Sequence, residues 1–243
     1  MSTTVLKRPK TKRLPASATA PSSATESSDD YLKAILELSG DARQQVSASD
    51  LAIALKISRA SVTKMLQKLS ATKPPLVIYE KHHGVQLADA GAERALEVVR
   101  HHRLIETFLH RVLGYPWDEV HDEAERLEHF ISERFEERIA AILNHPQYDP
   151  HGHPIPDLDG TIPATGSKTV AQMNVDSGGK VVSVSDRNPE MLRYLGAHGI
   201  TPGAKLRLLE RLPFQGSYRV LIGTCKESVL LSEALAMAIY VAS

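Results

Sequence analysis

Apolar positions in the first third of the chain alternate between a helical and a strand-like spacing. From Asp29 onward, DDYLKAILELSG spaces its leucines and isoleucine for one face of a helix. Ser47 is placed to cap a short second helix that contains LAIAL, and Ser58 to cap a third, RASVTKMLQKLS. LVIYEKHHGVQLAD then alternates around a His-Gly pair and predicts a β-hairpin. This order of elements, over residues 29–95, predicts a winged helix-turn-helix whose third helix enters the major groove of DNA.

The pattern changes twice more along the chain. Helical spacing between stop signals from Gly and Pro predicts a helical domain over residues 96–148, with helices at about 89–113, 117–130 and 133–143. A Pro-, Gly-, Asp- and His-rich stretch, 149–168, is interpreted as a linker. Short apolar segments separated by turn signals then predict a small β-barrel over 169–243, which makes the fold class α+β.

Charge is spread unevenly although the formal net charge is zero. Residues 1–28 carry five Lys/Arg and one acid, lack apolar periodicity and predict a disordered basic tail. Residues 89–143 carry seven basic and thirteen acidic side chains. A basic N-terminal segment favours contact with nucleic acid, and an acidic central segment favours cation binding.

Cysteine and hydropathy exclude several classes of protein. A single cysteine, Cys225, excludes an internal disulfide and a cysteine-rich zinc site. No apolar run approaches the roughly 18 residues of a membrane span, and the N-terminus lacks the apolar core of a signal peptide. A cytoplasmic protein without a membrane partner is expected.

Histidines and carboxylates recur at helical spacing in the middle of the chain. One pair is four residues apart, and a second set follows at i, i+4, i+7 and i+8; Asp30 of the first helix can reach the same region. Facing helices with such side chains form divalent-metal sites in helical bundles. A charged, solvated face is the alternative interpretation. The candidate ligands are Asp30, His102, Glu106, His121, Glu125, Glu128 and His129.

Polar and basic residues also gather at the start of the third predicted helix. Their side chains can bond phosphates or base edges, although a capped surface helix would have the same composition. The candidate DNA contacts are Ser58, Arg59, Ala60, Ser61, Thr63 and Lys64, with Lys81, His82 and His83 at the hairpin tip as further candidates.

Several of these stretches together resemble the diphtheria toxin repressor family of metal-dependent regulators. The matching pieces are DYLKAILEL, SRASVTKMLQKL, YEKHHGVQLADAG, HHRLIETFL, VHDEAERLEH and PIPDLDG. The region from VSDRNPEM to YRVLIG is similar to the SH3-like domain of ferrous iron transport accessory proteins. The resemblance implies a homodimeric repressor, not an enzyme, that binds a palindromic operator in double-stranded DNA when a metal ion is bound.

The resemblance also implies two metal sites. One would use Asp30, Glu125, Glu128 and His129. The other would use His102, Glu106 and His121, completed by a polar pair of the SH3-like domain; alignment places Asn188 and Met191 on that pair, and Glu190 is the nearer chemical candidate. The iron-sensing branch has Met and Cys at the positions of Asp30 and Glu125. Two carboxylates there resemble the manganese branch, in agreement with the preference of Mn²⁺ for oxygen ligands.

One residue departs from that branch, and three alternatives stay open. The manganese branch has another acidic ligand at the position of Lys33, so its close pair of metal ions is in doubt here. The expected cofactor is Mn²⁺, with Fe²⁺ in an iron-sensing member of the same family as the first alternative. A winged-helix regulator that responds to a different ligand is the second, and a metalloenzyme with a helical metal site is the third.

Overall fold

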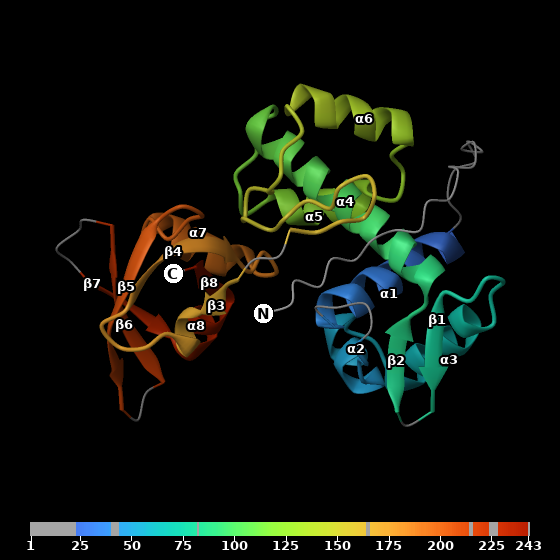
Figure 1. Ribbon diagram of the computed structural model, residues 1–243, viewed down its shortest axis with the longest axis horizontal. Coiled ribbons are helices and arrows are strands. Elements are labelled where there is room, and N and C mark those ends of the chain that lie inside the picture. The colour runs from blue at the N-terminus through green and yellow to red at the C-terminus, as the bar shows by residue number, and fades with distance from the viewer. Residues whose placement is uncertain are drawn as a thin grey trace.

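The computed structural model describes residues 23–39, 44–81, 83–163, 166–213, 216–223 and 228–242. Residues 1–22 of the expected basic tail and His82 of the expected hairpin tip lie outside the described residues. The chain forms three lobes, and the long helix α4, Asp89–Arg111, runs from the first into the second (Figure 1). The expected α+β architecture is confirmed.

The first lobe is the predicted winged helix-turn-helix. Ser47 accepts a hydrogen bond from the Asp50 backbone and caps α2, and Ser58 accepts one from the Ser61 backbone and caps α3. The lobe's elements are α1 (Ser23–Ser39), α2 (Ala48–Ala54), α3 (Arg59–Ser70), β1 (Val77–Glu80) and β2 (Gly84–Leu87). Strands β1 and β2 pair antiparallel, and the core between helices and hairpin includes Leu32, Ile35, Leu51, Leu66 and Val85.

Helix α1 begins at Ser23, six residues before the predicted start at Asp29. Its first turns contain no apolar stripe, which is why periodicity alone missed them. Ser28 and Asp29 are nevertheless buried, and the Asp29 carboxylate pairs with the Arg94 guanidinium of α4. Polar packing against α4 therefore extends the helix, and Asp30 lies within α1 instead of opening it.

The second lobe contains the C-terminal part of α4 with α5, Val120–Leu127, and α6, Glu133–Ile142, which Ser132 caps as predicted. Helix α5 is shorter than the expected 117–130. Trp117 precedes it in a turn and packs against the core of the third lobe, next to Gly196. Glu128 and His129 follow the last helical residue, so their side chains are directed by the turn after α5 and not by the helix alone.

The stretch expected as a linker is packed against α4. The Arg103 guanidinium donates to the Pro154 carbonyl over 2.5 Å, and Arg100 donates to the Pro156 carbonyl over 2.6 Å. Ile155 is buried in the core of the second lobe. These contacts fix the position of the chain between residues 147 and 156, which passes beside the candidate ligands of α4.

The third lobe contains a six-stranded antiparallel sheet with strand order β3-β8-β4-β5-β6-β7. One segment expected as strand throughout contains a short helix, because Ser232 caps α8 by accepting a hydrogen bond from the Leu235 backbone. The elements are β3 (Lys168–Thr169), the 3-10 turn Val170–Gln172, β4 (Gly178–Val184), α7 (Pro189–Ala197), β5 (Lys205–Leu212), β6 (Ser217–Ile222), β7 (Ser228–Ser232), α8 (Glu233–Ala238) and β8 (Ile239–Ala242).

Candidate metal centre and nucleic-acid interface

Three of the expected ligands meet where α1 crosses the end of α5. His129 Nε2 lies 2.9 Å from Asp30 Oδ1 and 3.6 Å from Glu128 Oε1, and one ligand atom from each residue lies within 4.8 Å of the others. The hydrogen bond to Asp30 raises the pKa of His129, and the charge of Glu128 adds to this effect. We call Asp30, Glu128 and His129 the bridging cluster, because Asp30 belongs to the first lobe and the other two to the second.

The fourth expected member, Glu125, lies in a different group. It lies next to the ammonium of Lys33, which is surrounded by the carboxylates of Glu125 and Glu128 and the ring of His102. The distances from Lys33 Nζ are 2.5 Å to Glu125 Oε1, 2.8 Å to Glu128 Oε2 and 3.0 Å to His102 Nδ1. Glu125 therefore contacts a lysine where the sequence predicted that it would share a site with Asp30.

The Lys33 ammonium stays charged in this environment. Burial by itself lowers the pKa of the group, but the Glu128 and Glu125 carboxylates raise it, and the net effect is a pKa above the ordinary value. In turn, the Glu125 carboxyl has a lowered pKa: burial opposes ionisation, but the charge and hydrogen bond of Lys33, together with the nearby His102 and His121, outweigh the effect of burial.

A second cluster joins the second lobe to the third. His102 Nε2 and His121 Nδ1 lie 3.1 and 3.4 Å from the same oxygen, Glu106 Oε1, as the sequence predicted for this trio. Asp186, two residues after the end of β4, adds a carboxylate oxygen 3.8 Å from His121 Nδ1. We call His102, Glu106, His121 and Asp186 the interdomain cluster.

The carboxylate from the third lobe is Asp186 and not Glu190. Glu190 is exposed in the first turn of α7 and belongs to none of the metal-competent groups among the described residues. Asn188 is the N-cap of that helix and accepts a hydrogen bond from the Met191 backbone, so the helix start occupies the residues that the sequence assigned to the site. Asp186 precedes this cap and therefore points back toward the second lobe.

Two further histidines line the same cluster and were missed by sequence reasoning. His151 Nδ1 lies 3.7 Å from Glu106 Oε1, and His153 Nδ1 lies 3.4 Å from Asp186 Oδ2. His151 Nε2 donates to the Trp117 carbonyl over 2.7 Å, which leaves Nδ1 as its free ligand atom. The His-x-His spacing was the available signal, but it lay in the stretch interpreted as a linker.

The described residues fit a divalent metal ion at both clusters. Glu106 Oε2, His129 Nδ1 and His151 Nδ1 are buried and have no hydrogen-bond partner within the described part of the chain. A buried polar atom without a partner costs about 1–3 kcal/mol, and a cation bound to Glu106 and His151 would remove that cost in the interdomain cluster, whereas His129 faces the bridging cluster through Nε2. Oxygen and imidazole ligands without sulfur are the donor set of Mn²⁺ and other first-row divalent ions.

Without a metal ion, protons would compensate the acidic charge of the interdomain cluster. Burial lowers the pKa of His102, but the charge of Glu106 and the hydrogen bonds to Glu106 and Glu128 together raise it more, to about 10. His151 has a pKa of about 9 for the same two opposing reasons. Glu106 is held well below its usual pKa by His102 despite complete burial. Metal binding therefore has to displace protons from these imidazoles.

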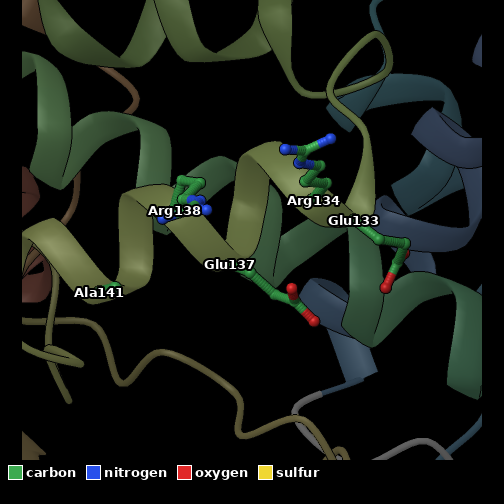
Figure 2. Close-up of a pocket in the computed structure, with 5 residues that line it drawn as sticks. All are labelled: Glu133, Arg134, Glu137, Arg138 and Ala141. Atoms are coloured by element: carbon green, nitrogen blue, oxygen red, sulfur yellow. The ribbon is translucent and has the colours of Figure 1, made fainter.

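A cleft of about 610 Å³ between the lobes reaches the interdomain cluster and Lys33. Residues of α1, α4, the packed connection and the third lobe line it, including Lys33, His102, His153, Asp186 and Tyr240. A separate hollow of about 580 Å³ lies along α6 and is lined by that helix alone, through Glu133, Arg134, Glu137, Arg138 and Ala141 (Figure 2). None of these five belongs to the predicted metal ligands or DNA contacts.

His101 is nearby but is not a free ligand. Its Nδ1 lies 3.2 Å from the Glu128 carbonyl and its Nε2 lies 3.1 Å from Glu136 Oε2, so both ring nitrogens are engaged. His101 therefore positions the turn that carries Glu128.

The recognition helix presents its N-terminal residues to solvent. Ser58, Arg59, Ala60, Ser61 and Lys64 are exposed, and Thr63 is half-buried. A hollow of about 820 Å³ between α1 and α3 is lined by Asp30, Ser61 and Lys64 among others. One ligand of the bridging cluster thus lies beside the surface predicted to contact DNA.

Comparison with known proteins gives matches along nearly the whole described chain. Three family models match in order: iron dependent repressor, N-terminal DNA binding domain (residues 23–85); iron dependent repressor, metal binding and dimerisation domain (88–157); and FeoA domain (168–243). The chain is 30% identical to the iron-dependent repressor IdeR of Mycobacterium tuberculosis (strain ATCC 25618 / H37Rv) over 223 residues, 87% of this chain and 94% of that protein.

Two further relatives are named as regulators. The HTH-type transcriptional regulator MntR of Bacillus subtilis (strain 168) is 35% identical over 128 residues, 51% of this chain and 85% of that protein. A solved structure of a manganese-dependent transcriptional repressor in complex with manganese has a TM-score of 0.82 at 41% identity, covering 89% of this chain and 99% of that one. Within the described ranges, no helix is long and apolar enough to cross a membrane.

Proposed function

Because this chain belongs to the iron dependent repressor family of DNA-binding, metal-dependent transcriptional regulators, we propose that it is a manganese-responsive repressor that binds a palindromic operator as a homodimer. The family consists of DNA-binding repressors and not of enzymes, as the sequence predicted.

The bridging cluster carries the proposal of a metal-controlled switch. Asp30 belongs to α1, which packs on α2 in the core of the DNA-binding lobe, whereas Glu128 and His129 belong to the dimerisation lobe. A cation bound there would be coordinated by side chains of both lobes and would hold the two lobes together. Fixing α1 also fixes α3 through their shared core, and the distance between two recognition helices decides whether both half-sites are met. Such differential stabilisation of the DNA-competent arrangement is what an allosteric effector requires.

The donor set supports manganese over iron. The bridging cluster consists of two carboxylates and one imidazole, and none of these three side chains contains sulfur. Later first-row metals gain more than Mn²⁺ from nitrogen and sulfur ligands, so an oxygen-rich site reduces their advantage. The manganese-dependent repressor with a TM-score of 0.82 adds support, while IdeR, the iron-dependent relative, is less similar at 30% identity.

A homodimer is supported by the surface of the second lobe. Large apolar side chains are exposed there beside many charged ones, and an exposed apolar surface of this kind is typical of an interface. They are Val112, Leu113, Leu127, Phe130, Phe135 and Ile142.

The interdomain cluster is proposed as a second metal site. Glu106 and His121 come from the dimerisation lobe and Asp186 from the third lobe, so an ion there would hold the third lobe in place. His151 and His153 add imidazoles on the same side.

Anisotropy titrations with operator DNA test the proposal. A duplex would be selected from a random pool in the presence of Mn²⁺, and its binding measured with Mn²⁺, with Fe²⁺ under anaerobic conditions, and with chelator. Mn²⁺ should activate binding at a lower free concentration than Fe²⁺, and chelator should abolish it. The double substitution Glu128→Gln with His129→Gln is the control that should lose the metal response. Equal or better activation by Fe²⁺ would overturn the manganese assignment.

A further inference from the structure

A buried lysine ammonium lies among the ligands of the metal centre. Lys33 is only 6% exposed, and its side chain reaches from α1 of the DNA-binding lobe into the second lobe. Its Nζ donates to both oxygens of Glu128, at 2.8 and 3.1 Å, and to Glu125 Oε1 at 2.5 Å, and lies 3.0 Å from His102 Nδ1. Without Lys33, His102, Glu125 and Glu128 would themselves form a group with metal-binding geometry.

We propose that the Lys33 ammonium is a resident cation of the centre. It takes the place of a metal ion between His102, Glu125 and Glu128, restricts the adjoining bridging cluster to a single ion, and holds the DNA-binding lobe on the dimerisation lobe before any metal binds. The inference deepens the proposed function, because it assigns a positioning role to a residue that is not itself a ligand.

Geometry supports the replacement of an ion. An ammonium has three donors and no acceptor, and here three carboxylate oxygens, Glu125 Oε1 and both oxygens of Glu128, accept from it in place of water, while the His102 ring lies beside them with Nδ1 2.5 Å from Glu128 Oε2. A divalent ion bound to the same oxygens and ring nitrogen would occupy the same space as Nζ and would repel its charge. The carboxylates of Glu125 and Glu128 are therefore already compensated by one positive charge in the metal-free protein.

The same contacts connect the two lobes. Lys33 belongs to α1, His102 to α4 and Glu125 to α5, so breaking the group would remove a contact of α1 with both helices of the second lobe, although the Asp29–Arg94 pair still joins α1 to α4. Removing one member of a buried ion pair leaves an uncompensated charge, which strongly favours separation and solvation of the group. Lys33 thus keeps α1 near the second lobe in the metal-free protein. A metal ion at the bridging cluster then only has to fix the exact position of α1.

Metal stoichiometry distinguishes a resident cation from a merely structural lysine. Calorimetric titration of Mn²⁺ into the full chain would compare wild type with Lys33→Met, Lys33→Glu and Lys205→Glu. Lys205 is exposed on β5, so this last variant makes the same charge change away from the centre. Lys33→Met and Lys33→Glu should each bind one more Mn²⁺ per chain than wild type, the second more tightly because it adds a fourth ligand. Lys205→Glu should not.

Hydrogen exchange in chelator tests the metal-independent connection. Amides of α1 in Lys33→Met and Lys33→Glu should exchange at least about ten times faster than in wild type, and Mn²⁺ should restore their protection in Lys33→Glu. Wild-type protection in Lys33→Met, or unchanged stoichiometry in folded Lys33→Glu, overturns the inference. A wild type that binds DNA equally well with and without Mn²⁺ would refute the proposed switch, while the chelator result would still decide the role of Lys33.

Discussion

Replacing Asp30 by alanine isolates the proposed switch from the folding of the protein. Asp30 is the ligand that the DNA-binding lobe contributes to the bridging cluster, and its side chain is 44% exposed. Its contact with His129, at 2.9 Å, is therefore a partly solvated ion pair worth at most about 1 kcal/mol to folding. For a chain of this size such a loss lowers Tm by only about 2–4 °C, so the variant should remain a folded dimer.

The expected effect on DNA binding is larger than the effect on folding. Asp30 couples the metal ion to the position of α1, and allosteric coupling energies are typically about 1–3 kcal/mol. Asp30→Ala should therefore weaken operator binding by about 5- to 150-fold at a concentration of Mn²⁺ that saturates the wild type. The ligands of the interdomain cluster are untouched, so the variant should still bind Mn²⁺ there.

Paired measurements on one preparation give the test. Calorimetry reports the Mn²⁺ bound per chain, anisotropy reports operator affinity, and sedimentation reports the dimer. Asp176→Ala is the matched control, because it removes an exposed carboxylate of the third lobe, 72% exposed, that lies in neither cluster. Wild-type operator affinity in Asp30→Ala would show that Asp30 does not join the lobes, and the proposed mechanism would be wrong.

Three other predictions concern DNA contact, the second site and pH. Arg59→Ala and Lys64→Ala should weaken operator binding without changing metal affinity. Loss of a phosphate contact should lower the salt dependence of the binding constant by about one unit, and loss of a base contact should lower the discrimination between operator and other sequences by about 1–3 kcal/mol. Wild-type affinity in both variants would place the DNA surface elsewhere. Asp186→Ala should weaken Mn²⁺ binding at the interdomain cluster at least about 10-fold and Glu190→Ala should not, and the reverse order would contradict the assignment. The pKa of His102 is raised to about 10, so the protonated ring stabilises the metal-free protein fully below about pH 6.5, and this stabilisation is lost as pH rises through about 10. The Tm measured by calorimetry should therefore fall over that interval, and it should fall less in His102→Gln than in the wild type.

Local signals in the sequence were sufficient for the DNA-binding lobe except for the start of its first helix. Ser47 and Ser58 cap helices through bonds to residues three positions later, and the hairpin depends on alternation within a dozen residues. The start of α1 was missed because Asp29 is buried through a pair with Arg94, a contact between residues 65 positions apart. Periodicity cannot detect a helix end that is stabilised by polar tertiary packing.

The metal centre divides in the same way. Helical spacing and family resemblance together predicted eight candidate ligands, of which the structure collects Asp30, Glu128 and His129 in one cluster and His102, Glu106 and His121 in the other. Asp186 replaced Glu190 because the α7 cap, and not sequence spacing, decides which residue of that stretch faces the second lobe. His151 joined the site because Arg100 and Arg103 hold the supposed linker against α4.

The sequence by itself determined the order of the three lobes, the capped helices of the DNA-binding lobe and the chemistry of most ligands, because those depend on residues close together in the chain. Lys33 was visible in the sequence only as a departure from the manganese branch. Its role depends on where a side chain from α1 meets Glu125 and Glu128, more than ninety residues later. Only the tertiary structure decided that meeting, because the pairing of buried charges follows from the packing of whole helices and not from their local pattern.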